Sequence, residues 1–310
     1  MTTSQSNDVS APPSTAEICG WWVPYWARLS EPQFFKEIFG ATPFVFRESQ
    51  YVDSSRVCCG FSDPLDVLNR LGGPVNVISP RDGSRPIEKT VQTIEEATAA
   101  YDSGWAAAVP DIDRRIPDVH TARCLLAEIL EIPWATIRTG LFLAPPGGGL
   151  AYHFDARHIF SIQWLGEKRW VYEPNTQAPY PLENHVRPHV LPDQLSRYVT
   201  APFPDRPTSE AMSVILRPGS ALYLPLGYWH ETEALTPSVS VSFGVDVPRV
   251  LDRWLERLRE CLLTEPRFRN SQPLPKTMAL CPEETQAAQI DELNLLFELV
   301  AAWKKGGLPP

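Results

Sequence analysis

The sequence lacks the features that mark a secreted, a membrane-bound or a nucleic-acid-binding protein. Its first 17 residues are polar and contain no apolar stretch of the kind found in a signal peptide. No apolar run approaches the ~20 residues that a helix needs to cross a membrane. Acidic residues outnumber basic ones by 37 to 28, and the formal net charge of -9 gives no basic footprint for nucleic acid. We therefore expect neither a membrane nor a nucleic-acid partner.

Cysteine pairs at metal-binding spacing are also absent. The six cysteines are scattered and form no C-x-x-C motif, which argues against a thiolate zinc site. Because no signal peptide is evident, reduced thiols in a cytoplasmic protein are the simplest interpretation.

Proline, in contrast, is abundant. The chain has 32 prolines, and proline breaks helix interiors, so a mainly helical protein is not expected. Its 310 residues suit one large domain with a smaller helical appendage. We predict a disordered tail over residues 1–17, a main domain over residues 18–247 and a helical region over residues 248–310.

Helical patterns flank a β-rich block. Ser30 is a candidate N-cap for a short helix with Pro32 in its first turn, and residues 43–47 form a strand candidate. Residues 93–101 and 118–130 have the spacing of helices with one buried face. After the block, Leu251, Leu255, Leu258 and Leu262 form one amphipathic stripe, and Ile290, Leu293, Phe297 and Val300 form a second. These two helices are expected to pack on the main domain or to form a homodimer contact.

The core of the main domain, residues 139–247, consists of short β-prone runs broken by turn residues. The runs cover residues 139–143, 158–165, 169–172, 213–216, 221–224 and 238–245. Strands punctuated in this way predict an antiparallel barrel or a double-sheet jelly roll. A polar, proline-rich insertion over residues 177–210, whose role the sequence does not indicate, separates the two halves.

His153, Asp155 and His230 are the candidate metal ligands. Residues i and i+2 of a strand point to the same face, so His153 and Asp155 can both project into a barrel interior. His230 follows another apolar run in the same block. Two histidines and one carboxylate with open coordination positions form the facial triad of non-haem iron(II) oxygenases. H-x-D alone is a weak signal, but here a glycine-rich turn precedes it and a strand-like run follows.

Two stretches around these residues resemble a known family. GGGLAYHFDARHIFSIQWLGEKRWVYEP and LRPGSALYLPLGYWHETEA with SVSVSFGV look like the two halves of the core of the JmjC/cupin-like 2-oxoglutarate oxygenases, and within that group they are most similar to the ribosomal-oxygenase type. The combination of H-x-D, G-x-K-x-W, P-G-x-x-x-Y-x-P and W-H carries this resemblance. It implies a double-stranded β-helix, mainly β with flanking helices, that uses iron(II), 2-oxoglutarate and dioxygen.

The resemblance also implies roles for three further residues. Lys168 lies fifteen positions after His153, where relatives carry a basic residue that pairs with the far carboxylate of 2-oxoglutarate. A solvated turn lysine is the alternative. Ser240 and Ser242 occupy positions where relatives place polar residues near the cosubstrate, although polar positions on a half-exposed strand explain them equally well. His158 is either a substrate contact or an ordinary strand histidine.

The function that follows is hydroxylation of an amino-acid side chain in a peptide or protein. The same chemistry on a free amino acid or a natural-product scaffold is the nearest alternative. A non-oxygenase cupin is disfavoured, because such proteins generally use H-x-H with a Glu, whereas Asp155 takes the second position here. The sequence does not identify the substrate or the oxidised carbon.

Overall fold

A computed structural model describes residues 20–47, 60–80, 86–269 and a few positions between 294 and 301. Its internal contacts divide the chain into two compact units, Met1–Val247 and Pro248–Pro310. The predicted disordered tail and most of the second C-terminal helix lie outside the described residues.

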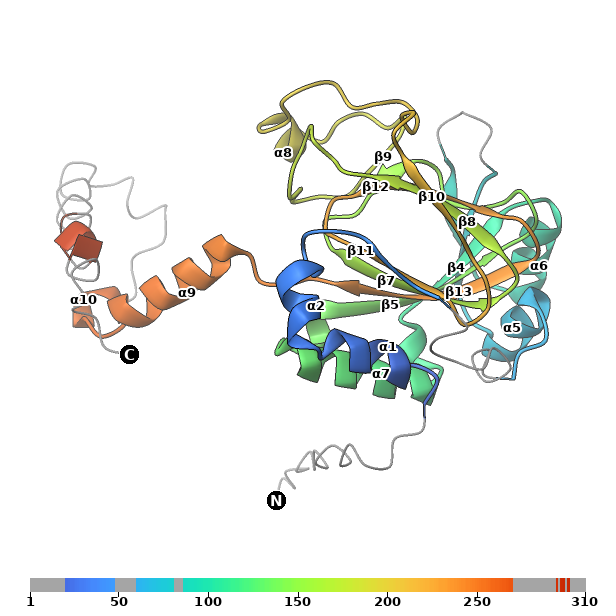
Figure 1. The fold of residues 1–310 in the computed structure, drawn as a ribbon, viewed down its shortest axis with the longest axis horizontal. Helices are drawn as coiled ribbons and strands as arrows, with labels where there is room; N and C mark the ends of the chain where they lie inside the picture. Colours follow the sequence, from blue (N-terminus) through green and yellow to red (C-terminus); the bar gives the residue numbers. More distant parts are fainter. Residues whose placement is uncertain are drawn as a thin grey trace, which may run out of the picture. The chain divides into compact units, whose positions relative to one another are not determined.

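Two antiparallel sheets form the first unit (Figure 1). The larger sheet has eight strands in the order β1 (Phe44–Phe46), β11 (Ala221–Leu224), β7 (His158–Leu165), β13 (Ser238–Val245), β5 (Ile137–Ala144), β4 (Ala106–Pro110), β2 (Val75–Ile78) and β3 (Glu88–Val91). The smaller sheet has five, in the order β10 (Met212–Leu216), β8 (Lys168–Glu173), β12 (Trp229–Ala234), β6 (His153–Phe154) and β9 (His185–Val186). The predicted double-sheet jelly roll with flanking helices is confirmed.

The larger sheet is wider than the sequence indicates. β4, β2 and β3 extend it beyond β5, and none of the three was expected. β4 is rich in alanine and the exposed residues of β3 are charged or polar, so neither has the β-branched alternation typical of a strand. Pairing with an existing edge, rather than local propensity, accounts for these strands.

The described helices of the first unit are α1 (Val23–Leu29), α2 (Pro32–Glu37), α5 (Pro64–Leu71), α6 (Ile94–Asp102), α7 (Pro117–Leu130) and α8 (Asp193–Ser196). The second unit contains α9 (Val250–Leu262) and α10 (Pro266–Arg269). Thr93 and Glu96 cap α6 reciprocally. The expectation that Ser30 caps the next helix is wrong. Pro32 is the first residue of α2 and Glu31 its extended N-cap, while the Ser30 hydroxyl bonds back to the carbonyl of Ala27 at the end of α1.

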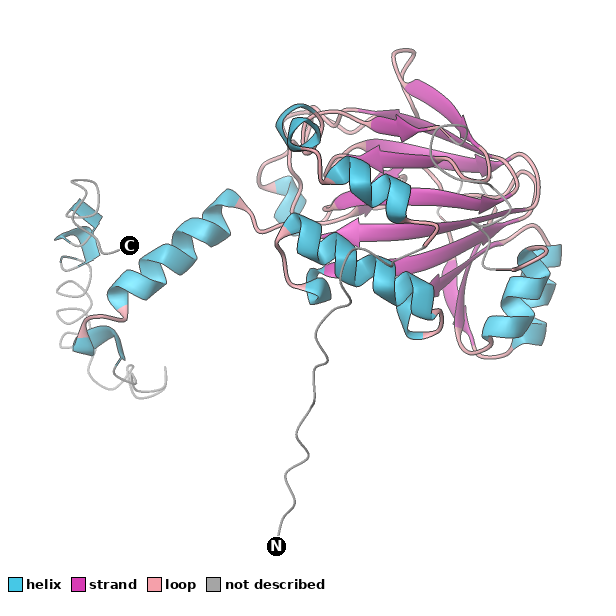
Figure 2. Cartoon of the chain, turned by 60° about the horizontal axis from the view of Figure 1, so that its bottom comes forward, coloured by secondary structure: helices cyan, strands magenta, loops and turns pink. Residues whose placement is uncertain are grey.

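Helices α1 and α7 cover the outer face of the larger sheet (Figures 1 and 2). Trp26 shows how they are held. Its indole N–H donates to the carbonyl of Ala122 in α7 at 2.9 Å, and its ring packs edge-on against Phe160 of β7 and Phe243 of β13. Such aromatic pairs contribute about 1 kcal/mol each beyond the area they bury.

The insertion between the two halves of the core folds against the smaller sheet. Its apolar residues Leu195 and Phe203 pack with Phe154 of β6 and Trp229 of β12. The buried Glu173 carboxylate accepts hydrogen bonds from the Tyr152 hydroxyl and from the backbone and side chain of Thr208. The segment is therefore anchored directly behind the strands that carry the candidate ligands.

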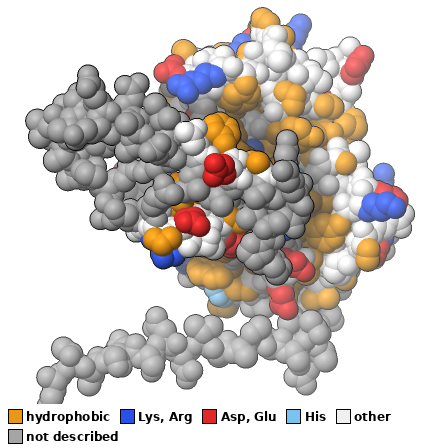
Figure 3. Space-filling view, turned by 90° about the vertical axis from the view of Figure 1, so that its left-hand side faces the viewer, with side chains coloured by type: hydrophobic (Ala, Val, Ile, Leu, Met, Phe, Trp, Pro, Cys, Tyr) orange, Lys and Arg blue, Asp and Glu red, His pale blue; other side chains and the backbone are white. Residues whose placement is uncertain are grey.

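Figure 3 shows how charged side chains are distributed on one face of the molecule. On the face in Figure 3, acidic and basic side chains lie scattered among neutral and hydrophobic ones, and the described residues there form no basic cluster. Within the described ranges, no helix is long and apolar enough to cross a membrane.

In the second unit, α9 carries the predicted apolar stripe. The side chains of Leu251 and Leu255 are more than half exposed. Whether this stripe forms a homodimer contact stays a prediction.

A buried ion pair joins three elements beside β5. Asp113 of the 3-10 helix Ile112–Arg114 accepts hydrogen bonds from Arg123 of α7 and Thr139 of β5. Burial alone would raise the pKa of Asp113, but the hydrogen bonds from Thr139 and Arg123 outweigh burial and hold that pKa below its ordinary value. Because folding lowers the pKa, the pair stabilises the fold at neutral pH, and this contribution is lost as the pH falls below about 4.

Replacing Arg123 by Met should therefore lower the free energy of unfolding at pH 7 by about 3 kcal/mol, because the Asp113 carboxylate loses its buried cation. Urea denaturation measures this loss. Arg114→Met is the matched control, since Arg114 is 78% exposed and its pair with Asp111 should contribute less than about 1 kcal/mol. A similar loss in both variants would contradict the role given to the buried pair.

Candidate metal centre

The strand register brings the three predicted ligands together. β12 pairs with β6 so that His230 lies directly opposite His153. Asp155 follows the end of β6 and shares the inward face of His153. Both histidines are buried, with 9% and 3% of their surface exposed for His153 and His230.

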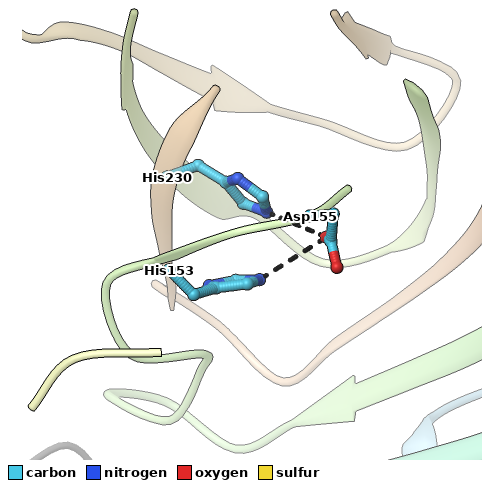
Figure 4. A group of neighbouring side chains, drawn as sticks. All are labelled: His153, Asp155 and His230. Carbon is cyan, nitrogen blue, oxygen red and sulfur yellow. Dashed lines mark ion pairs between the residues drawn. The ribbon is translucent and has the colours of Figure 1, made fainter. Parts of the chain in front are cut away.

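The three side chains point toward one another (Figure 4). The Nε2 atoms of His153 and His230 lie 3.8 and 3.7 Å from Oδ2 of Asp155. One nitrogen or oxygen atom from each residue lies within 4.8 Å of the other two, a spacing that suits a shared metal ion.

Backbone carbonyls orient both imidazoles. Nδ1 of His153 lies 2.7 Å from the carbonyl oxygen of Ala151, and Nδ1 of His230 lies 3.0 Å from that of Tyr228. Since a carbonyl can only accept, each Nδ1 carries the proton and each Nε2 presents its lone pair to the centre. Burial, with the neighbouring His153, lowers the pKa of His230 to about 3 despite the opposing effect of Asp155, which keeps this ring neutral and ready to bind a metal.

Aromatic packing fixes the ligand strands from behind. Tyr152 stacks on Trp229 with ring centroids 4.7 Å apart, and Phe154 packs edge-on against the same indole at 4.6 Å. These three residues immediately precede or follow the histidine ligands and face the opposite side of the sheet. On the inner side, Trp170 lies parallel to the ring of His230 at 5.5 Å.

The glycine-rich turn before His153 is required by a close backbone approach. A Cβ atom on Gly149 would lie 2.0 Å from the carbonyl oxygen of Thr232, and the φ of Gly149 is +157°. The close approach lets Leu150 and Thr232 exchange two hydrogen bonds. The chain is thereby aligned with β12 before it enters β6.

Two cavities meet at the centre. The larger, of about 380 Å³, is bounded by His153 and Asp155 and extends along β2, β3, β4 and β5. The smaller is bounded by all three ligands and runs between the sheets to Lys168. A metal bound here would face both spaces.

Lys168 is buried at the end of the smaller cavity and is not a solvated turn residue. It begins β8, is 3% exposed, and donates from Nζ to the hydroxyl of Ser240 on the opposite sheet at 2.8 Å. Burial lowers the pKa of Lys168 to about 7. No described carboxylate pairs with this ammonium group, so the cavity ends at a cation that lacks a counter-ion.

The structure places the predicted serines in the same cavity. Ser240 and Ser242 both line it, and Ser242 also borders the larger cavity. His158, in contrast, lies on the outer face of β7, where it bonds to the Tyr223 hydroxyl and stacks on Phe39, as an ordinary strand histidine does.

Sequence reasoning missed two polar groups in the smaller cavity. The Ser161 hydroxyl and the Trp170 indole N–H are buried and have no hydrogen-bond partner among the described residues. Ser161 lies opposite Ser242 in the pairing of β7 with β13. A hydroxyl between the apolar neighbours Phe160 and Ile162 was the available signal, but only the register shows which groups it faces.

Comparisons with known proteins show what the chain resembles. The family model described as the JmjC domain matches residues 119–252. The ribosomal protein uL16 3-hydroxylase of Escherichia coli is 32% identical over 72% of this chain and 54% of its own length. The uncharacterized protein YxbC of Bacillus subtilis is 32% identical over 56% of this chain and 54% of its own length. The chain thus spans about half the length of these curated relatives.

Solved structures of an E. coli protein were also matched. YcfD, a ribosomal oxygenase solved with cobalt and 2-oxoglutarate, aligns with a TM-score of 0.47 and 18% identity, over 84% of this chain and 66% of that one.

Removing one ligand tests the centre directly. His153→Ala should weaken Mn²⁺ binding at least about 100-fold, because loss of a ligand should cost no less than loss of a supporting contact. Isothermal titration calorimetry measures the affinity, and circular dichroism checks the fold. His120→Ala is the control, since His120 is half exposed on α7. Unchanged Mn²⁺ affinity in folded His153→Ala would refute the assignment.

Proposed function

Because the chain carries a JmjC domain over residues 119–252, we propose that it is an iron(II)- and 2-oxoglutarate-dependent oxygenase that hydroxylates an amino-acid side chain in a peptide or protein. The observation that carries the proposal is the buried Lys168, which has no carboxylate partner among the described residues and lies at the end of a cavity that begins at two histidines and one carboxylate.

The donor set fits iron(II). Two neutral imidazoles and one carboxylate leave positions open on one side of a metal, as oxygen-activating iron sites require. A structural zinc site would fill four positions and close the centre. His153, Asp155 and His230 would hold the ion, and the carbonyls of Ala151 and Tyr228 keep both imidazoles in the binding tautomer.

The smaller cavity fits 2-oxoglutarate, which carries a carboxylate at each end. Lys168 and Ser240 would bind the far carboxylate, and the Ser161 hydroxyl and Trp170 indole N–H supply buried donors that have no described partner. Ser242 borders the same space. A buried carboxylate needs such donors, and a buried ammonium needs an anion.

When bound, iron, 2-oxoglutarate and dioxygen together supply the oxidising power for hydroxylating an unactivated C–H bond. The chain would contribute the positions of the reacting groups. Its two histidines and the aspartate would hold the metal, and Lys168 would bind the cosubstrate. No side chain has to act as a general acid or base.

The larger cavity would receive the substrate side chain. Protein substrates are favoured because one relative is named a ribosomal protein uL16 3-hydroxylase. Another, from Drosophila willistoni, is 24% identical over 66% of this chain and is named the bifunctional lysine-specific demethylase and histidyl-hydroxylase NO66. A homodimer through the C-terminal helices, and the absence of nucleic-acid and membrane partners, remain part of the proposal.

A spectroscopic measurement tests the cosubstrate claim. Anaerobic addition of iron(II) and 2-oxoglutarate to the protein should produce the metal-to-ligand charge-transfer band of a chelated 2-oxo acid. If this band is absent in well-folded protein, the proposal that the protein binds 2-oxoglutarate at an iron(II) centre is wrong. Succinate release over candidate peptides and free amino acids then decides between the protein substrate and the small-molecule alternative.

Lys168 should control the affinity for 2-oxoglutarate. Lys168→Ala should weaken binding about 10- to 100-fold, because a charge-assisted hydrogen bond to a buried carboxylate is lost. Arg169→Ala is the control, since the neighbouring Arg169 pairs with Glu233 at the surface. The titration is followed through the charge-transfer band, and equal affinity in wild type and Lys168→Ala would count against the role.

The pH dependence provides a second measurement on the same residue. Since the pKa of Lys168 is lowered to about 7, the ammonium loses its proton above that pH and binding of the dianion should weaken by up to about tenfold per pH unit. Lys168→Arg, whose guanidinium stays charged, should flatten this profile. A profile equally steep in both proteins would show that another group titrates.

A further inference from the structure

Two arginine side chains line the larger cavity, and the proposed reaction uses neither of them. Arg157 follows the candidate ligand Asp155 by two residues, and Arg138 lies on β5 opposite Gly244 of β13. Both therefore border the space that the substrate would enter.

Arg157 is held in the wall of this cavity. Its side chain is 18% exposed, and its Nε atom is buried without a hydrogen-bond partner among the described residues. Gly244 makes room for it, since a Cβ atom there would lie 2.7 Å from Cδ of Arg157. Arg157 is consequently packed in the wall of the cavity that His153 and Asp155 also line, and most of its side chain is shielded from solvent.

Neither arginine has a hydrogen-bonded carboxylate among the described residues, although Arg138 is 69% exposed and therefore reaches solvent. Asp246 approaches Nε of Arg157 at 3.8 Å and Nε of Arg138 at 3.6 Å, both longer than a hydrogen bond, and its side chain is 40% exposed. Glu88 on the cavity wall is hydrogen-bonded to Asn76. The remaining acidic residue among the described lining is Asp155, which belongs to the metal centre.

We propose that Arg157 and Arg138 form a carboxylate-binding subsite of the substrate cavity, and that the substrate presents an acidic side chain or a chain-terminal carboxylate to it. This inference rests on the proposed function. A planar guanidinium offers paired N–H donors that match a carboxylate. An arginine that is largely buried and has no hydrogen-bond partner binds a carboxylate with a larger gain in free energy than a solvated arginine does. A cationic substrate group would be repelled.

The subsite would also fix the orientation of the bound substrate. The carboxylate would lie against Arg157 while the carbon to be oxidised faces His153 and Asp155 in the same cavity. If Arg157 instead serves only to hold Asp246 at the end of β13, substrate charge will not matter. The two roles therefore differ in a measurable way.

Binding of labelled peptide pools tests the subsite without turnover. The probes are fluorescein-labelled degenerate heptapeptides whose central residue is Glu, Gln or Arg and whose C-terminus is an amide, plus a Gln-centred pool with a free C-terminal carboxylate. Fluorescence anisotropy measures their affinity for protein loaded with Mn²⁺ and 2-oxoglutarate. The two carboxylate-bearing pools separate an acidic side chain from a chain end as the source of the anion.

Wild-type protein should bind one or both carboxylate-bearing pools about tenfold or more tighter than the Gln amide pool, and the Arg pool most weakly. Arg157→Gln should bring the carboxylate and amide pools within about twofold of each other, and Arg138→Gln should reduce the preference partly. Arg157→Lys should retain part of it, and the surface control Arg169→Gln should retain all of it. Thermal melting checks that each variant is folded.

The proposal is overturned if no pool binds, if wild type shows no preference for a carboxylate, or if the preference survives in Arg157→Gln. Failure of the proposed function is read separately, because the charge-transfer band with iron(II) and 2-oxoglutarate does not depend on Arg157. A protein that shows the band but ignores substrate charge would refute the subsite alone.

Discussion

The register between β6 and β12 is the constraint on which the candidate centre depends. It places His230 opposite His153 on the inner face and Trp229 opposite Phe154 on the outer face. A slip of one residue would turn the indole into the cavity and the imidazole into the apolar cluster behind it. Burying an aromatic side chain is worth about 2–3 kcal/mol, so the cluster of Tyr152, Phe154 and Trp229 resists that slip. Hydrophobic packing outside the cavity thus fixes the geometry inside it.

A cationic side chain lines each of the two cavities that meet at the candidate centre. Lys168 closes one end of the interior and Arg157 lines the other cavity, and neither has a hydrogen-bonded carboxylate among the described residues. Burying a cation without such a partner is unfavourable. Both positions therefore favour anionic ligands, which we propose are the cosubstrate at one and part of the substrate at the other. Between them lie His153, Asp155 and His230, which could hold the metal.

Sequence alone predicted the parts that carry strong local signals. The strands β5, β7, β8, β10, β11 and β13 combine β-prone runs with Pro and Gly breaks, whereas β12, which carries His230, was not among the predicted runs. The fifteen-residue spacing together with the family resemblance singled out Lys168. The edge strands β2, β3 and β4 lack those signals and form by pairing. The short strand β9 also lacks a β-prone run, yet its His185 pairs with Phe154 of β6. Ser161, Arg138 and Arg157 reach the cavities through long-range register and packing, which no local pattern encodes.

The order of the ligands along the chain has a consequence for how the protein is made. His230 emerges from the ribosome 77 residues after His153. At the usual rate of synthesis this interval is on the order of 4 to 15 s. Until it ends, His153 and Asp155 form only an incomplete pair of ligands, and closing so long a loop carries an entropic cost that β6 and β12 must overcome together. Tight metal capture is thereby deferred until the jelly roll that encloses the ion is nearly complete.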